Sequence, residues 1–178
     1  GTAVLGAAGE AIERQRLLAD LEPVPRERLE LPLLAARMSV LAYETDEEKI
    51  RSGCLAHGLQ LLQFCPQEAA RPGASTPQSG TSPQWFVADA DRGGELYVVF
   101  RGTKGTADLF RDLRANPERH GPDKFHSGFL SAVRDDAVLR EVLRLHLRDD
   151  AALFACGHSL GGALAMTLLS ADGLLPPT

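Results

Sequence analysis

The sequence has few cysteines and no excess of positive charge. Its 178 residues include three cysteines, Cys54, Cys65 and Cys156, which form neither a CxxC pair nor a Cys/His ligand spacing. A disulfide framework and a zinc site are therefore not expected, and the cysteine pattern favours a reducing compartment. Lysine and arginine total 19 against 24 for aspartate and glutamate, a formal net charge of -5. This balance disfavours nucleic acid or an anionic membrane surface as a partner.

The sequence also lacks a recognisable signal peptide and a convincing membrane span. It does not begin with Met, so we expect it to start inside a longer protein or after a removed segment, and residues 1–9 lack a basic n-region. The uncharged run 151–171 is long enough to cross a bilayer, but its centre holds Gly157, His158 and Ser159 in place of large apolar residues. We expect no transmembrane segment and a cytoplasmic or peripheral membrane location.

The composition favours a single globular domain, since 44% of the residues are hydrophobic and 24% are charged. Residues 66–83 are rich in Pro, Gly, Ser and Thr and have almost nothing to bury, which predicts a mobile loop. Towards the N-terminus, apolar spacing and helix-forming residues predict helices over 10–20 and 31–43, with prolines that include Pro32 acting as breaks.

The middle and C-terminal parts of the sequence predict an α/β fold. The run Leu96–Phe100 is continuously apolar and rich in β-branched and aromatic residues, as in a strand covered on both faces. Two glycines in the turn 91–94 predict a hairpin before it. The helix expected over 160–171 is apolar on nearly all sides, which suits a helix buried against a sheet. The expected elements are strands over 59–65, 84–90, 95–101 and 151–156 and helices over 136–148 and 160–171. For the first of these, an apolar run alone does not separate a strand from the end of a helix.

A G-x-S-x-G motif lies between the last strand and the last helix, at Gly157, His158, Ser159, Leu160 and Gly161. A buried strand entering the motif and an apolar helix leaving it predict a nucleophile elbow, with a fortuitous Gly/Ser turn as the alternative. The glycines would be needed because strand and helix approach too closely for a Cβ. Ser159 would expose its Oγ in a strained turn, and the amide of Leu160 would point at a developing oxyanion.

Three further motifs occur in the order found in the class 3 lipase family of α/β hydrolases, which the sequence resembles over roughly 84–171. Residues 98–103 resemble the end of the family's strand and its oxyanion loop, and residues 108–113 resemble its acidic helix. His126-Ser127-Gly128-Phe129 resembles its His-x-Gly-Phe motif. The resemblance implies an α/β-hydrolase fold with a mostly parallel sheet flanked by helices.

The same resemblance implies a domain organisation and a set of site residues. An N-terminal helical segment over 1–50 would pack on a partial catalytic domain over 51–178. Ser159 would be the nucleophile, and the backbone N–H groups of Thr103 and Leu160 would form the oxyanion hole, with the Thr103 hydroxyl as a further donor. Structural roles are implied for Gly157, His158, Gly161, His126, Asp108 and Asp112.

The sequence departs from the family pattern in two places. The tryptophan usual in the acidic helix is Leu109 here. Triads of this fold run Ser, then Asp or Glu, then His along the chain, yet Asp172 is the one carboxylate after Ser159 and no histidine follows it. We therefore expect the triad acid and base beyond Thr178. The strand over 151–156 would then form an exposed apolar edge, which predicts that these residues alone are poorly soluble and inactive.

The motif predicts a serine hydrolase, and the resemblance implies a serine carboxylic ester hydrolase that acts on lipid acyl esters through an acyl-enzyme in its full-length form. The substrate would be a triacylglycerol, a diacylglycerol, a phospholipid or another acyl ester, met in transient contact with a lipid interface and without a metal or cofactor. One alternative is a catalytically silent lipase-like signalling or scaffold protein. Another is a different α/β hydrolase, such as a thioesterase or a feruloyl esterase.

Overall fold

The computed structural model describes residues 26–67, 83–90, 94–102, 117–120 and 123–175. The chain divides into two compact units, 1–33 and 34–178, and every contact discussed below lies within the second. The expected helix over 10–20, most of the loop over 66–83, Thr103 and the expected acidic helix over 108–113 lie outside the described residues.

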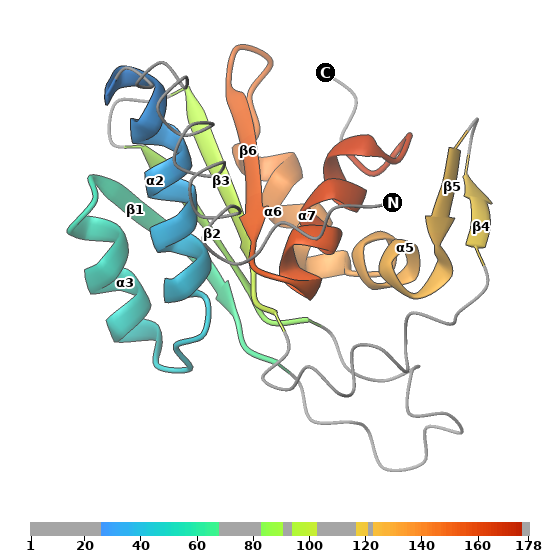
Figure 1. The fold of residues 1–178 in the computed structure, drawn as a ribbon, viewed down its shortest axis with the longest axis horizontal. Helices are drawn as coiled ribbons and strands as arrows, with labels where there is room; N and C mark the ends of the chain where they lie inside the picture. Colours follow the sequence, from blue (N-terminus) through green and yellow to red (C-terminus); the bar gives the residue numbers. More distant parts are fainter. Residues whose placement is uncertain (1–25, 68–82, 91–93, 103–116, 121–122, 176–178) are drawn as a thin grey trace, which may run out of the picture. The chain divides into compact units, whose positions relative to one another are not determined.

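The described chain begins with two helices, continues with five strands and ends with two helices, a strand and a last helix (Figure 1). They are α2 (Arg26–Leu41), α3 (Glu47–Leu55), β1 (Leu59–Cys65), β2 (Trp85–Ala90), β3 (Glu95–Phe100), β4 (Pro117–His120), β5 (Asp123–His126), α5 (Ser127–Arg134), α6 (Ala137–His146), β6 (Ala152–Gly157) and α7 (Leu160–Ser170). The strands and helices expected from residue 59 onward are confirmed to within a few residues, and the pair of β4 and β5 was not predicted from the sequence.

One prediction about the N-terminal region is wrong. Pro32 does not break the chain before a helix but lies inside α2, which begins at Arg26. A proline removes one backbone hydrogen bond from a helix and crowds the preceding turn. The following turns of α2 are stabilised by packing, because Met38 is buried against the sheet and Leu34 and Leu41 pack beside it.

The main sheet is mixed, with the strand order β1-β2-β3-β6. The pairs β1–β2 and β2–β3 are antiparallel, the second because the short connection after β2 can only return the chain as a hairpin. β6 pairs with β3 in parallel after a crossover that includes α5 and α6. The parallel character expected for most of the sheet is therefore present, within the described strands, at the β3–β6 pair.

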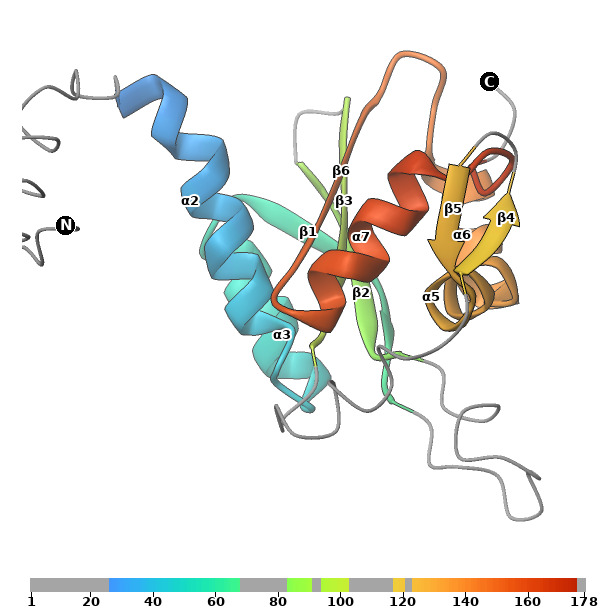
Figure 2. The same cartoon turned by 45° about the vertical axis from the view of Figure 1, so that its right-hand side comes forward.

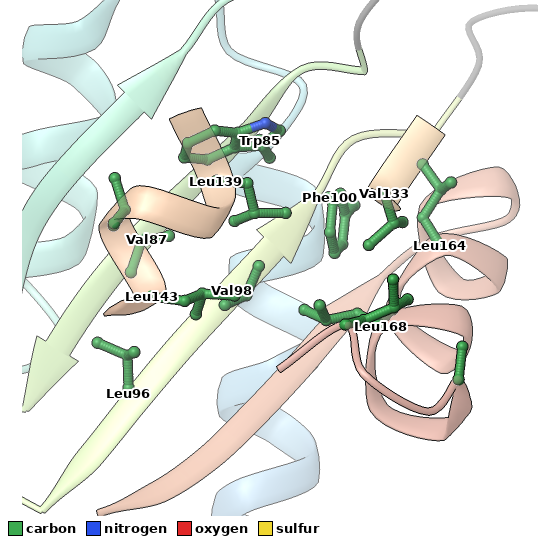
Figure 3. Packing of buried hydrophobic residues seen from close by; sticks show 14 of the residues in the cluster. Trp85, Val87, Leu96, Val98, Phe100, Val133, Leu139, Leu143, Leu164 and Leu168 are labelled. Atoms are coloured by element: carbon green, nitrogen blue, oxygen red, sulfur yellow. The ribbon is translucent and has the colours of Figure 1, made fainter. Parts of the chain in front are cut away.

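Helices cover both faces of this sheet (Figures 1 and 2). On one face, α5, α6 and α7 pack on alternate residues of β2 and β3, including Trp85, Val98 and Phe100 (Figure 3). On the other face, Met38 of α2 and Cys54 of α3 pack on the intervening residues of those strands. Five of the six residues of β3 are buried, which confirms a strand covered on both faces.

β6 and α7 form the element pair that positions the G-x-S-x-G motif. Among the described strands, β6 lies at one edge of the main sheet, and most of its residues are half-buried. α7 packs on β3 and β6 through Leu164, Ala165 and Leu168. In the part of the chain that the structure describes, no helix combines the length and the apolar character needed to cross a bilayer.

Candidate active site

The turn between β6 and α7 holds Ser159 in an unusual backbone conformation. β6 ends at Gly157, α7 begins at Leu160, and Ser159 has φ 56° and ψ -119°. Among the described residues it is the only non-glycine residue with a positive φ. Such a conformation costs about 1–3 kcal/mol and persists only where the surroundings enforce it. The strand–turn–helix context expected around Ser159 is therefore present, and its strain is located at the serine.

Close backbone approach around the turn explains the two glycines of the motif. A Cβ on Gly157 would lie 2.6 Å from the carbonyl oxygens of Gly161 and Phe100. A Cβ on Gly161 would lie 2.9 Å from the carbonyl carbon of Phe100 and 3.0 Å from that of Arg101. The end of β3, the end of β6 and the first turn of α7 thus meet at distances that only glycine permits.

The backbone hydrogen bonds of the described turn do not use the amide of Leu160. The amide of Gly161 donates to the His158 carbonyl at 3.0 Å, and the amides of Gly162 and Ala163 donate to the Ser159 carbonyl at 3.0 and 3.2 Å. Among the backbone bonds of the described residues, the amide of Leu160 is not a donor. It lies in the first turn of α7, where the helix dipole favours negative charge. The role of this amide in an oxyanion hole stays a prediction.

The side chain of Ser159 is exposed and makes no capping hydrogen bond to α7. No hydrogen bond joins its Oγ to a histidine among the described residues. The sequence implied a structural role for His158, whose Nδ1 lies 3.0 Å from the hydroxyl oxygen of Tyr43. The described turn therefore presents a serine hydroxyl to solvent without a general base of its own.

The end of β3 and the following Gly102 lie against the turn that holds Ser159. Phe100 is paired with Gly157 in the β3–β6 register. Gly102 is buried, and a Cβ there would lie 2.5 Å from the Tyr43 hydroxyl oxygen and even closer to the carbonyl oxygen of His158. The residue that precedes Thr103 thus contacts the turn that holds Ser159. Thr103 itself lies outside the described residues.

A polar cluster that the sequence did not reveal lies beside the elbow. The guanidinium carbon of Arg101 lies 5.8 Å from the centre of the Tyr43 ring, and Arg101 Nη1 donates to Gln84 Oε1 at 2.9 Å. Gln84 is buried at the start of the strand expected over 84–90, directly after the expected loop. Neither Tyr43 nor Gln84 belongs to a motif, and no signal in the sequence separates them from ordinary polar residues.

His126 occupies the N-cap position of α5 rather than a place at the elbow turn. Its ring stacks on Phe129 with a centroid distance of 4.2 Å and an interplanar angle of 23°. A Cβ on Gly128 would lie 3.2 Å from His126 Cε1, so the glycine of the His-x-Gly-Phe motif makes room for the ring. These contacts suit a histidine that organises the start of α5.

Two cysteines of the described residues, Cys54 and Cys156, are poorly suited to act as nucleophiles. Burial raises the pKa of the Cys54 thiol to about 11, with the charge of Arg51 acting weakly in the opposite direction. Burial also raises the pKa of the Cys156 thiol, two residues before His158, against the effect of a hydrogen bond with Ser39. Both thiols are therefore protonated near neutral pH. The described residues contain no group of three His, Cys, Asp or Glu side chains placed to hold a metal ion.

Comparison with known sequences identifies relatives of the region that contains this site. Residues 97–173 match the model of the lipase (class 3) family. A lipase of Rhizopus niveus and one of Rhizopus oryzae are each 33% identical over 89 residues, which are 46% of this chain and 22% of the relative. The chain thus aligns with about a fifth of the length of these curated relatives.

Solved structures of lipases share the fold of the chain. The Rhizomucor miehei lipase propeptide complex has a TM-score of 0.56 at 20% identity, covering 86% of this chain and 50% of that one. The lipase of Rhizopus microsporus var. chinensis has a TM-score of 0.55 at 21% identity, with coverages of 86% and 55%. A nonglycosylated lipase of Yarrowia lipolytica has a TM-score of 0.58 at 19% identity, with coverages of 82% and 54%. The chain therefore has part of an α/β-hydrolase fold, and its residues 97–173 are similar to the class 3 lipase family.

Proposed function

We propose that Ser159 is the nucleophile of a serine carboxylic ester hydrolase that acts on lipid acyl esters in the full-length protein. The observation that carries this proposal is the strained backbone of Ser159, with φ 56°, in a glycine-enclosed turn between β6 and α7. Protein structures retain such strain where the surroundings enforce it, and it concentrates at functional sites. The class 3 family match and the lipase relatives support a lipid ester as the substrate.

In the proposed reaction, Ser159 Oγ attacks the carbonyl carbon of the ester while its proton passes to a general base. The tetrahedral oxyanion accepts hydrogen bonds from the amide of Leu160 and from the amide and hydroxyl of Thr103, each donor contributing about 3 kcal/mol. Collapse of the intermediate expels the alcohol, which takes the proton from the base and leaves Ser159 acylated. Water then attacks the acyl-enzyme with the help of the same base, releasing the fatty acid and restoring the serine.

The general base and its carboxylate partner belong, on this proposal, to residues outside the described part of the chain. His158 points to Tyr43, and His126 is stacked on Phe129 at the start of α5. The proposed substrate classes are triacylglycerols, diacylglycerols and phospholipids, which share an acyl ester carbonyl next to long apolar chains. Because such lipids aggregate in water, the protein would meet them in transient contact with a lipid–water interface.

Labelling of the full-length protein with a fluorophosphonate tests the nucleophile directly. An activated Ser159 displaces fluoride from phosphorus and becomes covalently labelled, so Ser159→Ala is expected to abolish labelling. Ser170→Ala is the matched control, because Ser170 is exposed at the far end of α7 and should label at the wild-type rate. A folded full-length protein that takes up no label would instead support the catalytically silent signalling or scaffold protein.

A further inference from the structure

The loop between α2 and α3 is fastened to the end of β3 by one buried amide. Gln84 is 3% exposed, and its Nε2 donates to the carbonyl oxygens of Ala42 at 2.8 Å and Glu44 at 2.5 Å. Its Oε1 accepts from Arg101 Nη1 at 2.9 Å. The side-chain amide of Gln84 thus bonds the two residues that flank Tyr43 and the residue before Gly102.

This arrangement holds Tyr43 against the elbow. The half-buried Tyr43 ring lies under the Arg101 guanidinium, and its hydroxyl oxygen is 3.0 Å from His158 Nδ1. The same oxygen lies where a side chain at Gly102 would have to go. One tyrosine hydroxyl therefore contacts both the residue before the proposed nucleophile and the residue before the expected oxyanion donor Thr103.

The contact matters because the conformation of Ser159 must be enforced by its surroundings. The carbonyl of His158 accepts the first hydrogen bond of the turn, from the amide of Gly161 at 3.0 Å. The His158 side chain is exposed, so its bond to Tyr43 restrains a group that solvent would otherwise leave mobile. Fixing His158 on both its backbone and its ring fixes the direction in which the next residue presents its hydroxyl.

We propose that Tyr43 is a positioning residue for Ser159, acting through its hydrogen bond to His158. The inference rests on the proposed function of Ser159 and adds to it a residue from outside the stretch that matches the family. Tyr43 makes no chemical step in this scheme. It restrains the angle of the elbow relative to the oxyanion loop, so it affects the rate of attack more than the binding of the reagent.

The test uses fluorophosphonate labelling of the full-length protein, resolved into the reagent affinity KI and the maximal rate constant kinact. Tyr43→Phe removes one hydroxyl and keeps the ring, and it should lower kinact about 5- to 10-fold, the range expected for one hydrogen bond. KI and the thermal unfolding midpoint should stay unchanged. Tyr97→Phe is the matched control, because Tyr97 is the other of the two tyrosines and its hydroxyl donates to Glu95 at 2.7 Å.

A second measurement asks whether the effect passes through His158. In a His158→Ala background, adding Tyr43→Phe should change kinact less than twofold, since the partner of the hydroxyl is already gone. A full 5- to 10-fold further loss in that background would overturn the inference. So would a wild-type kinact in the single variant, a loss matched by Tyr97→Phe, or a loss that accompanies a lowered unfolding midpoint.

The failure of this inference is distinguishable from the failure of the proposed function. If the wild-type protein is not labelled at Ser159, the proposed function fails and Tyr43 has nothing to position. If the wild-type protein is labelled and Tyr43→Phe is labelled equally fast, the nucleophile stands and the positioning role is overturned.

Discussion

Gln84 and Trp85 are neighbours in the sequence, yet they anchor opposite layers of the domain. Trp85 Nε1 donates to Asp136 Oδ2 at 2.6 Å, on the face of the sheet that α5, α6 and α7 cover. Gln84 fastens the loop after α2, which belongs to the layer on the other face. Both side chains are buried, so each polar group depends on its partner for the hydrogen bond that water would otherwise supply.

The two side chains differ in which further groups their hydrogen-bond partners contact. Asp136 also caps α6, where its Oδ1 accepts from the amide of Leu139 at 2.9 Å, so both of its bonds serve the packing of one helix. The bonds of Gln84 continue through Arg101 and Tyr43 to the turn that holds Ser159. We call the Trp85–Asp136 hydrogen bond the Trp85 anchor and the hydrogen bonds of the Gln84 side chain the Gln84 anchor. We expect the Trp85 anchor to affect only the free energy of unfolding. The Gln84 anchor should affect both the free energy of unfolding and the reactivity of Ser159.

The largest effect on stability is expected from Asp136→Ala. The variant removes an N-cap, worth about 1 kcal/mol, and leaves the buried indole N–H of Trp85 without an acceptor, which costs about 1–3 kcal/mol. A total loss of about 2–4 kcal/mol in the free energy of unfolding should appear in urea denaturation. The kinact of the folded fraction for fluorophosphonate should be unchanged.

Asp136→Asn is the matched control for this prediction. Its side-chain oxygen can still accept a hydrogen bond, so the loss of stability should be smaller than in Asp136→Ala. A fall of kinact in either variant, measured per folded molecule, would show that the packing of α6 also affects the reactivity of Ser159. The separation between the two anchors would then be wrong.

A smaller loss of stability, accompanied by a loss of reactivity, is expected from Gln84→Ala. The variant leaves the carbonyls of Ala42 and Glu44 and one Arg101 N–H without their partner, and these groups can recover part of the loss by binding water. We expect about 1–3 kcal/mol less stability and a several-fold lower kinact. Gln63→Ala is the control, because this exposed glutamine of β1 bonds only the adjacent carbonyl of Phe64 within the described residues. A Gln84→Ala protein with wild-type kinact would disconnect Gln84 from the site.

The elbow and the strands around it could be predicted because their signals are local. The glycines on either side of Ser159 are required by contacts within the strand–turn–helix unit and with the end of β3, and the apolar run of β3 reflects burial on both faces. Pro32 shows the limit of local rules. A single proline is a strong break in isolation, but packing of the later turns of α2 outweighs it.

The polar cluster beside the elbow could not be predicted, because its bonds join distant parts of the chain. Gln84 bonds carbonyls that lie 42 and 40 residues earlier, and Tyr43 meets His158 across 115 residues. Nothing in the composition of the segment before Gln84 marks that residue as buried. The strand directions of the mixed sheet could not be predicted either. Apolar patterning indicates where strands lie but not whether neighbouring strands run parallel or antiparallel.

The smallest effect is expected at Cys54, which lies on the α2 and α3 face with no exposed surface. Burial raises the pKa of its thiol from 9.0 to about 11, so the folded protein holds this proton at a pH where the unfolded chain releases it. The stabilisation is complete below pH 9 and disappears as the pH rises towards 11, with about 1 kcal/mol lost by pH 10. Urea unfolding at pH 8 and pH 10 should therefore show a weaker pH dependence in Cys54→Ala than in the wild type, while Cys156 contributes equally to both. Equal pH dependence in the two proteins would contradict the assignment to Cys54, and a change of kinact at fixed pH would place this residue with the Gln84 anchor.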